Sequence, residues 1–150
     1  MPTAPRRRIL QSAGEVPIAL IDEVIDDMAA RMAGTEEARK CEGLSFSYRV
    51  SDRRVALARY DVQPRGRIVL TRNDSSPTTF SFSGGAEAFD QVLRGQAHAL
   101  TALMTRRIQL HGSLFHIRGL LRMMPAVHRA YSDAREAMIQ RHADRYDFRF

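Results

Sequence analysis

Residues 78–125, TTFSFSGGAEAFDQVLRGQAHALTALMTRRIQLHGSLFHIRGLLRMMP, contain the pattern that decides the fold of this chain. Phe80 and Phe82 alternate with polar residues, which is typical of a strand with one buried face and predicts strand 78–83. Phe89, Val92 and Leu93 then recur at helical spacing. The first half of the stretch therefore predicts a strand followed by a short helix that ends near residue 95.

The second half of the stretch repeats this order. After a helical segment that contains Leu103, Ile108 and Leu110 alternate with Gln109 and His111, which predicts strand 107–111. A glycine ends this strand, and an apolar, methionine-rich helix follows over residues 114–124. The stretch as a whole predicts strand, helix, helix, strand and helix.

This order resembles the sterol carrier protein 2 (SCP2) family of lipid-binding domains. Members of that family carry a strand, a helix ending near Gly, a Met-containing segment, a strand of the form K/R-φ-x-φ-x-G and a closing helix. Here the matching residues are Leu103 to Gly112, LMTRRIQLHG. The resemblance covers residues 44–125 and implies an elongated apolar cavity between a sheet and helices. It also implies ligands such as sterols, fatty acids or acyl-CoAs.

The chain departs from the family pattern at two positions. Arg106 stands where family members usually have Gly, so we expect a turn that tolerates a Cβ there. Ser113 stands where many members have Asp, and its hydroxyl is expected to cap the next helix.

Three further strands are predicted from alternation between turn residues, at 44–50, 54–61 and 67–72. With strand 78–83 they are expected to form an antiparallel meander, which strand 107–111 joins after the helical insertion. The predicted fold class is α+β, with a five-stranded mixed, mostly antiparallel sheet and helices packed on one face.

Helices are expected on either side of the strands. Residues 17–33 carry apolar residues at every fourth position from Leu20 to Met32, and residues 35–43 read as a polar connector. Pro125 is expected to kink or end the helix 114–124, and a further helix covers residues 126–143. Two alternatives remain for that last helix: a cover over the cavity, or a flank that packs passively.

The composition limits the classes of protein and partner. The 150 residues suit one domain at 16–150 after a flexible basic arm at 1–15. The net charge of +6 allows weak contact with an anionic membrane surface, but the scattered arginines contain no motif that reads nucleic acid. One cysteine and no apolar leader or spanning segment favour a cytoplasmic protein. The pattern specifies no oligomeric state.

Apolar residues of the predicted strands and helices are the candidate ligand-binding residues. Each can instead be ordinary core, but methionine adapts to varied ligands, and the SCP2 resemblance implies a cavity at these positions. The candidates are Phe82, Phe89, Leu103, Met104, Ile108, Leu110, Phe115, Leu120 and Met124.

The titratable residues indicate no catalytic, metal or cofactor site. The five histidines show no i,i+4 metal spacing, and the acidic residues between Asp22 and Asp27 are typical of a solvated helix face. Ser83-Gly84-Gly85 suits a helix cap better than a phosphate loop. Cys41 has no obvious activator beyond its basic neighbours.

Two functions are compatible with the pattern. The leading interpretation is binding or transfer of a hydrophobic small molecule, with no cofactor. The alternative is a tailoring enzyme, a cyclase or isomerase, that uses the same cavity for an apolar substrate. An apolar lining would favour carriage, whereas polar groups facing the pocket would favour the enzyme. A third interpretation is a partner-binding domain with a vestigial cavity.

Overall fold

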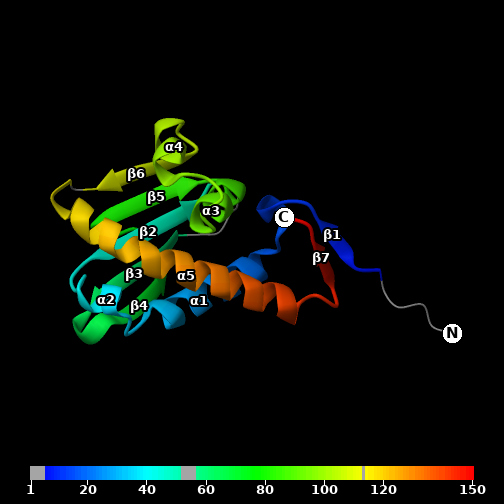
Figure 1. Cartoon of the computed structure of the whole chain (residues 1–150), viewed down its shortest axis with the longest axis horizontal. Coiled ribbons are helices and arrows are strands. Elements are labelled where there is room, and N and C mark those ends of the chain that lie inside the picture. Colours follow the sequence, from blue (N-terminus) through cyan, green and yellow to red (C-terminus); the bar gives the residue numbers. More distant parts are fainter. Residues whose placement is uncertain (1–5, 52–56, 113) are drawn as a thin grey trace.

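A computed structural model describes residues 6–51, 57–112 and 114–150. A five-stranded sheet is covered on one face by helices, with the long helix α5 running diagonally across it (Figure 1). The sheet has the order β4-β3-β2-β5-β6. Its strands are β2 Ser45–Val50, β3 Leu57–Gln63, β4 Arg67–Arg72, β5 Phe80–Gly84 and β6 Ile108–Gly112. The helices are α1 Ile18–Met32, α2 Glu36–Arg39, α3 Ala86–Leu93, α4 Ala99–Met104 and α5 Ile117–Arg141. Single 3₁₀ turns are η1 Ala13–Glu15, η2 Pro64–Gly66 and η3 Leu114–His116.

The α+β fold class and the five predicted strands are confirmed. Strand β3 is described from Leu57 to Gln63, two residues beyond the predicted end, while the predicted positions 54–56 and part of the turn before them lie outside the described residues. The predicted alternation is seen in the strands. The apolar residues of each strand face the helices, and the residues between them are mainly polar. Three of the four strand pairs are antiparallel and one is parallel, so the sheet is mixed.

The predicted meander of four successive strands is wrong at its last step. Strand β5 does not pair with β4; it lies parallel to β2, with Phe46 opposite Phe80 and Tyr48 opposite Phe82. The connection over residues 73–79 therefore has to pass from the β4 edge to the far side of β2. Alternation within a strand carries no information about which neighbour it selects, so the sequence pattern could not show this crossover.

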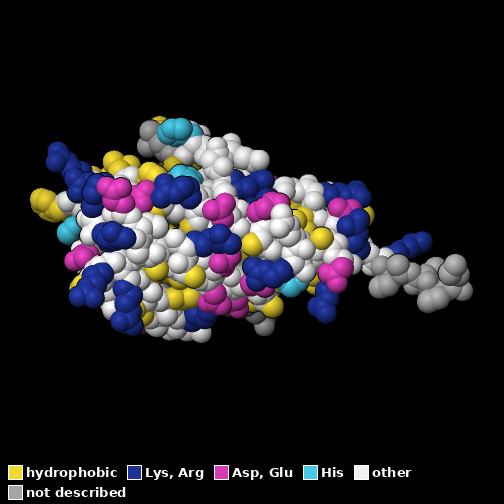
Figure 2. Space-filling view, turned by 60° about the horizontal axis from the view of Figure 1, so that its bottom comes forward, with side chains coloured by type: hydrophobic (Ala, Val, Ile, Leu, Met, Phe, Trp, Pro, Cys, Tyr) yellow, Lys and Arg dark blue, Asp and Glu magenta, His cyan; other side chains and the backbone are white. Residues whose placement is uncertain are grey.

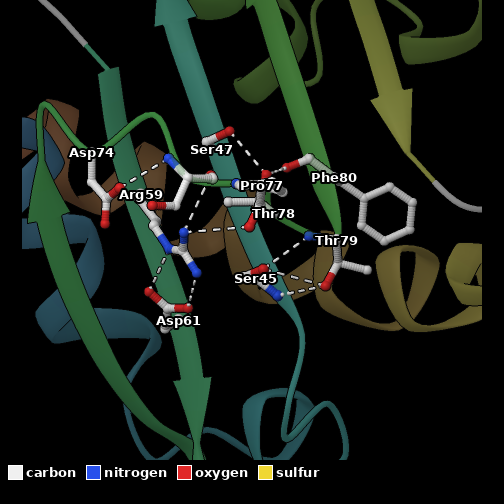
Figure 3. Close-up of polar contacts among 10 residues, drawn as sticks. Ser45, Ser47, Arg59, Asp61, Asp74, Pro77, Thr78, Thr79 and Phe80 are labelled. Carbon is white, nitrogen blue, oxygen red and sulfur yellow. Dashed lines mark hydrogen bonds and ion pairs between the residues drawn. The ribbon is translucent and has the colours of Figure 1, made fainter.

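Hydrogen bonds hold that connection on the polar face of the sheet (Figure 3). The Ser45 amide donates to Thr79 Oγ1 over 3.0 Å, and the Thr79 amide donates to Ser45 Oγ over 2.8 Å. Ser47 Oγ and Thr78 Oγ1 are 3.0 Å apart. Arg59 donates to the carbonyl of Pro77 while it forms an ion pair with Asp61. These bonds satisfy serine hydroxyls that are buried, and they fix β5 beside β2.

Helix α1 follows its predicted stripe closely. Leu20, Val24, Met28 and Met32 are all buried, and the acidic residues between them face outward. Asp22 and Asp26 both bind Arg72 of β4, which ties the solvated side of the helix to the sheet. These carboxylates pair with an arginine at the surface of the helix. This agrees with the interpretation of a solvated helix face rather than an acid–base site. The polar connector after α1 contains the short helix α2.

Helix α5 corrects the expected break at Pro125. One helix of 25 residues runs through the proline, and its second half packs on α1 through Ala130, Ala134 and Met138. Pro125 is exposed, so water can reach the carbonyl one turn earlier that has lost its donor. Because buried residues anchor this second half in the core, the structure favours the passive flank over a cover for the cavity.

The two chain ends pair with each other away from the main sheet (Figure 1). Strands β1 Arg8–Leu10 and β7 Tyr146–Phe148 are parallel, and Leu10 is fully buried. The predicted arm 1–15 is described from residue 6 onward, and it docks through Leu10. The expected cap at Ser113 lies outside the described residues, whereas Arg106 adopts the left-handed conformation, with φ 59°, that glycine favours. No helix among the described residues has the length and hydropathy of a membrane span.

A close backbone approach makes Gly112 sensitive to substitution. A Cβ there would lie 2.6 Å from Cδ1 of the fully buried Phe80 and 2.7 Å from the Thr79 carbonyl oxygen. Neither atom can move without disturbing the β5–β6 pair, so Gly112→Ala is expected to lower the free energy of unfolding by about 1–3 kcal/mol. Urea unfolding measures this loss. Gln109→Ala, at an exposed position of the same strand, is the control and should change stability by no more than about 0.5 kcal/mol. An equal or smaller loss for Gly112→Ala would contradict the prediction.

Candidate functional site

A cavity of about 370 Å³ lies between the helix-facing side of the sheet and the helices. Every strand of the main sheet contributes to its floor, while α1, α3, α4 and α5 form the walls. From the sheet come Phe46, Tyr48, Tyr60, Val62, Ile68, Phe82, Ile108 and Leu110. From the helices and the connections beside them come Met28, Met32, Phe89, Val92, Leu93, His98, Ala99, Leu103, Ile117, Leu120, Leu121, Met123, Met124 and Val127. The volume falls in the range usual for small-molecule sites.

The cavity reaches the surface between α4 and the first half of α5. His98, just before α4, and Leu121, on α5, both line the cavity and are both exposed to solvent. Strand β6 forms the floor between them, with Ile108 and Leu110 facing inward. The opening is therefore bounded by the segment that carries the SCP2-like sequence pattern.

Seven of the nine candidate residues line this cavity. They are Phe82, Phe89, Leu103, Ile108, Leu110, Leu120 and Met124. Met104 and Phe115 do not line it: their side chains are 76% and 98% exposed. Met104 follows Leu103 directly, and a helix turns by about 100° per residue, so the two side chains point in different directions and here only Leu103 reaches the cavity. Phe115 lies in η3, before α5 begins, where the helical spacing that suggested an inward position does not apply.

Sequence reasoning missed part of the wall. The pattern assigns Met28 and Met32 only to the buried stripe of the first helix and Ile68 only to a strand, while Val62 lies just beyond the predicted strand 54–61. Periodicity shows that a residue faces inward, but it does not distinguish a packed neighbour from empty space. The methionines on two separate helices were the available signal, since Met is common on adaptable apolar surfaces.

The polar atoms at the cavity wall are engaged with the protein. Tyr48 Oη donates to Tyr60 Oη over 2.6 Å, and Tyr60 Oη donates to the carbonyl of Ile25 over 2.8 Å. Burial raises the pKa of both hydroxyls, that of Tyr60 with a further contribution from Tyr48. Apart from these tyrosines and His98, the described lining contains no titratable side chain. The wall thus offers no carboxylate or pair of acid and base groups to an apolar ligand.

A smaller cavity of about 80 Å³ adjoins the first. Both are lined by Met28, Tyr48, Phe89 and Leu93, and the rings of Tyr48 and Phe89 lie 6.1 Å apart at this shared wall. At the far side of the smaller cavity lies Asp90, which is only 3% exposed.

Asp90 is the centre of a buried polar network. Arg94 Nε lies 3.1 Å from its Oδ2, Arg135 donates to its Oδ1 over 3.0 Å, and Tyr131 also donates to Oδ1. Arg135 in turn donates to the main-chain oxygen of Phe150 and lies over its ring. Burial and the Asp90 carboxylate raise the pKa of Tyr131. The network joins α3, α5 and the last described residue beside the cavity.

The other titratable candidates have structural partners. His128 Nδ1 lies 2.9 Å from the Leu93 carbonyl, and His142 pairs with Glu23. Cys41 is buried, donates to the Gly119 carbonyl, and has its pKa raised by burial, which disfavours the reactive thiolate. Gly85 is the N-cap of α3, as expected. No group of three or more potential metal ligands occurs among the described residues.

Solved structures of other proteins share this architecture. The ubiquinone synthesis protein UbiJ-SCP2 superposes with a TM-score of 0.55 at 8% identity, over 79% of this chain and 98% of that one. The sterol carrier protein domain 2 of Helicoverpa armigera gives 0.55 at 14% identity, over 75% and 88% of the two chains. The chain has the SCP2 fold. A crystal structure of sterol carrier protein 2 gives 0.50 at 18% identity, over 75% and 94%.

The SCP2 fold is thus shared across nearly the whole length of these domains. Neither a protein-family model nor a curated protein matches the sequence. At identities this low the likeness is one of fold, so the function has to be argued from the cavity of this chain.

Proposed function

We propose that this protein binds a hydrophobic small molecule in the larger cavity, for storage or transfer. The observation that carries the proposal is an apolar space of about 370 Å³ between the sheet and the helices, lined by residues of the hydrophobic core. All five strands of the main sheet contribute residues to its floor. The solved SCP2 domains, among them proteins titled sterol carriers, support the proposal by sharing this architecture.

Burial of apolar surface alone can supply enough free energy for micromolar binding, without a specific polar contact. A ligand that buries ten methylene groups gains roughly 8 kcal/mol of transfer free energy. Association costs several kcal/mol of this gain, and a micromolar dissociation constant corresponds to about 8 kcal/mol, so longer chains or ring systems bind at that level. Sterols, fatty acids and acyl-CoA-like lipids meet this requirement.

The enzyme alternative receives less support from the wall. A cyclase or isomerase needs an acid or base that faces the substrate. Of the titratable side chains in the described lining, His98 is exposed at the opening and the other two are tyrosines. The two tyrosine hydroxyls already bond to each other and to a main-chain carbonyl, and their pKa values are raised further from neutrality by burial. Binding or transfer is therefore the function that the geometry supports best.

Titration with an environment-sensitive fluorescent fatty acid tests the proposal. We expect saturable binding in the micromolar range, with displacement by unlabelled fatty acid or sterol. Ala99→Trp introduces an indole at a position that lines the cavity near its opening, so it should weaken binding without adding a charge. Non-saturable fluorescence, or equal affinity in a folded Ala99→Trp variant, would contradict ligand binding in this cavity.

A further inference from the structure

The excess of positive over negative charge in this chain arises in one segment. Residues 91–132 contain six arginines and no aspartate or glutamate, whereas the rest of the chain carries 17 Lys or Arg and 17 Asp or Glu. The whole net charge of +6 therefore comes from this segment. It forms α4, β6, η3 and the first half of α5, which are the elements around the cavity opening.

Only two of these six arginines pair with a carboxylate among the described residues. Arg94 pairs with Asp90, Arg129 pairs with Glu37, and Arg107 donates to Gln91. The other three, Arg106, Arg118 and Arg122, are exposed and form no ion pair with the residues that the structure describes. Glu36 and Glu37 of α2, which line a surface pocket together with Arg122, are already paired with Lys40 and Arg129.

The same elements expose the largest apolar side chains. Five large hydrophobic residues of the described chain are exposed, and the three most exposed of them, Met104, Phe115 and Leu121, lie in this segment. Leu121 also lines the cavity, so the apolar surface continues from the opening into the interior. At the left end of Figure 2, where α5 begins, hydrophobic and basic side chains reach the surface side by side.

We propose that this surface docks on an anionic lipid bilayer, with the cavity opening turned toward the membrane. The surface, called the rim below, consists of Met104, Arg106, Phe115, Arg118, Leu121 and Arg122. Exposed apolar side chains can enter the boundary between headgroups and acyl chains, and the unpaired guanidinium groups meet the phosphates there. A nucleic acid would use the charge but not Met104, Phe115 and Leu121, so the combination favours a bilayer.

The inference goes beyond ligand binding and does not depend on it. It rests on charge, exposure and the place of the rim, and a protein with an empty cavity would dock equally well. Membrane binding and fatty-acid binding can therefore be measured separately, and either can fail while the other stands.

Flotation with lipid vesicles tests the proposal on the full chain. Two vesicle types are compared: phosphatidylcholine alone, and an equimolar mixture of phosphatidylcholine and phosphatidylglycerol. We expect binding to the mixed vesicles. This binding should weaken as salt is added, because salt screens the attraction between the arginines and the anionic headgroups.

Each basic residue near an anionic surface contributes about fivefold to the partition coefficient. Arg106→Glu/Arg118→Glu should therefore reduce that coefficient by at least about 25-fold. Phe115→Ser/Leu121→Ser should reduce it through the apolar contribution alone.

Two control variants distinguish an effect of the rim from an effect of net charge or of exposed apolar surface elsewhere. Arg67→Glu/Arg145→Glu changes the net charge equally at exposed positions outside the segment, and Ile9→Ser removes an exposed apolar side chain elsewhere. Both should bind vesicles nearly as well as the parent, and the fatty-acid affinity of the folded Arg106→Glu/Arg118→Glu variant, whose two positions do not line the cavity, should stay unchanged. Three results would overturn the proposal: equal losses in rim and control variants, equal or absent binding to both vesicle types, or binding to duplex DNA without binding to vesicles.

Discussion

Replacing Leu103 by arginine is expected to weaken binding of the fluorescent fatty acid by about two orders of magnitude, which corresponds to roughly 3 kcal/mol. Leu103 lines the cavity from α4, so the longer side chain takes up apolar space there. A guanidinium that stays inside has no carboxylate among the described lining residues to pair with, and one that bends outward obstructs the opening. Fluorescence titration of the two proteins measures the difference.

The neighbouring residue supplies the control. Met104→Arg introduces the same side chain one position later on the same helix, but Met104 is exposed and does not line the cavity. Its fatty-acid affinity should equal that of the parent. Circular dichroism and thermal unfolding establish that both variants are folded. If the two substitutions weaken binding equally, or if neither does, the ligand does not occupy this cavity.

Removing the Asp90 carboxylate is expected to produce the largest loss of stability. Asp90→Ala should lower the free energy of unfolding by about 3–5 kcal/mol, because the guanidinium groups of Arg94 and Arg135 would be left together without their shared counter-charge. The side chains of both arginines are mostly buried, so water can replace the lost carboxylate only in part. Chemical denaturation measured at neutral pH provides the comparison.

Asp133→Ala is the matched control, since Asp133 is exposed on α5 and should change stability by no more than about 0.5 kcal/mol. Asp90→Asn keeps the shape of the side chain and one hydrogen-bond acceptor. Its loss of stability should therefore lie between those of Asp90→Ala and Asp133→Ala. A loss below about 1 kcal/mol for Asp90→Ala would show that the network is hydrated and contributes little to holding α3 against α5.

The elements of this fold were predictable from local pattern. Alternation of apolar and polar residues in 44–50 and 78–83 predicted strands, because a half-buried strand exposes every second side chain. The apolar stripe from Leu20 to Met32 predicted α1 for the equivalent helical reason. These periods are local properties of the backbone, and no tertiary information is needed to recognise them.

Much of the cavity wall was predictable as well, since seven candidate residues line it. The errors occurred where a position depends on the direction of one side chain. Met104 and Leu103 carry similar hydrophobicity, and only the packing of α4 over β6 determines which of them faces inward. Pro125 was misjudged for a related reason: a proline on the exposed side of a long, well-packed helix can be accommodated, whereas its sequence context alone suggests a break.

The sequence by itself thus determined that this chain forms a five-stranded α+β domain with helices on one face, because residue periodicity is set by backbone geometry. Only the tertiary structure decided that β5 lies parallel to β2, that α5 is continuous, and that the apolar faces leave an open space between them. It also placed the exposed Arg106, Arg118 and Arg122 on or beside the elements that bound the opening of that space. Strand partners, empty volume and surface charge depend on contacts between residues far apart in the chain, and no local pattern specifies those contacts.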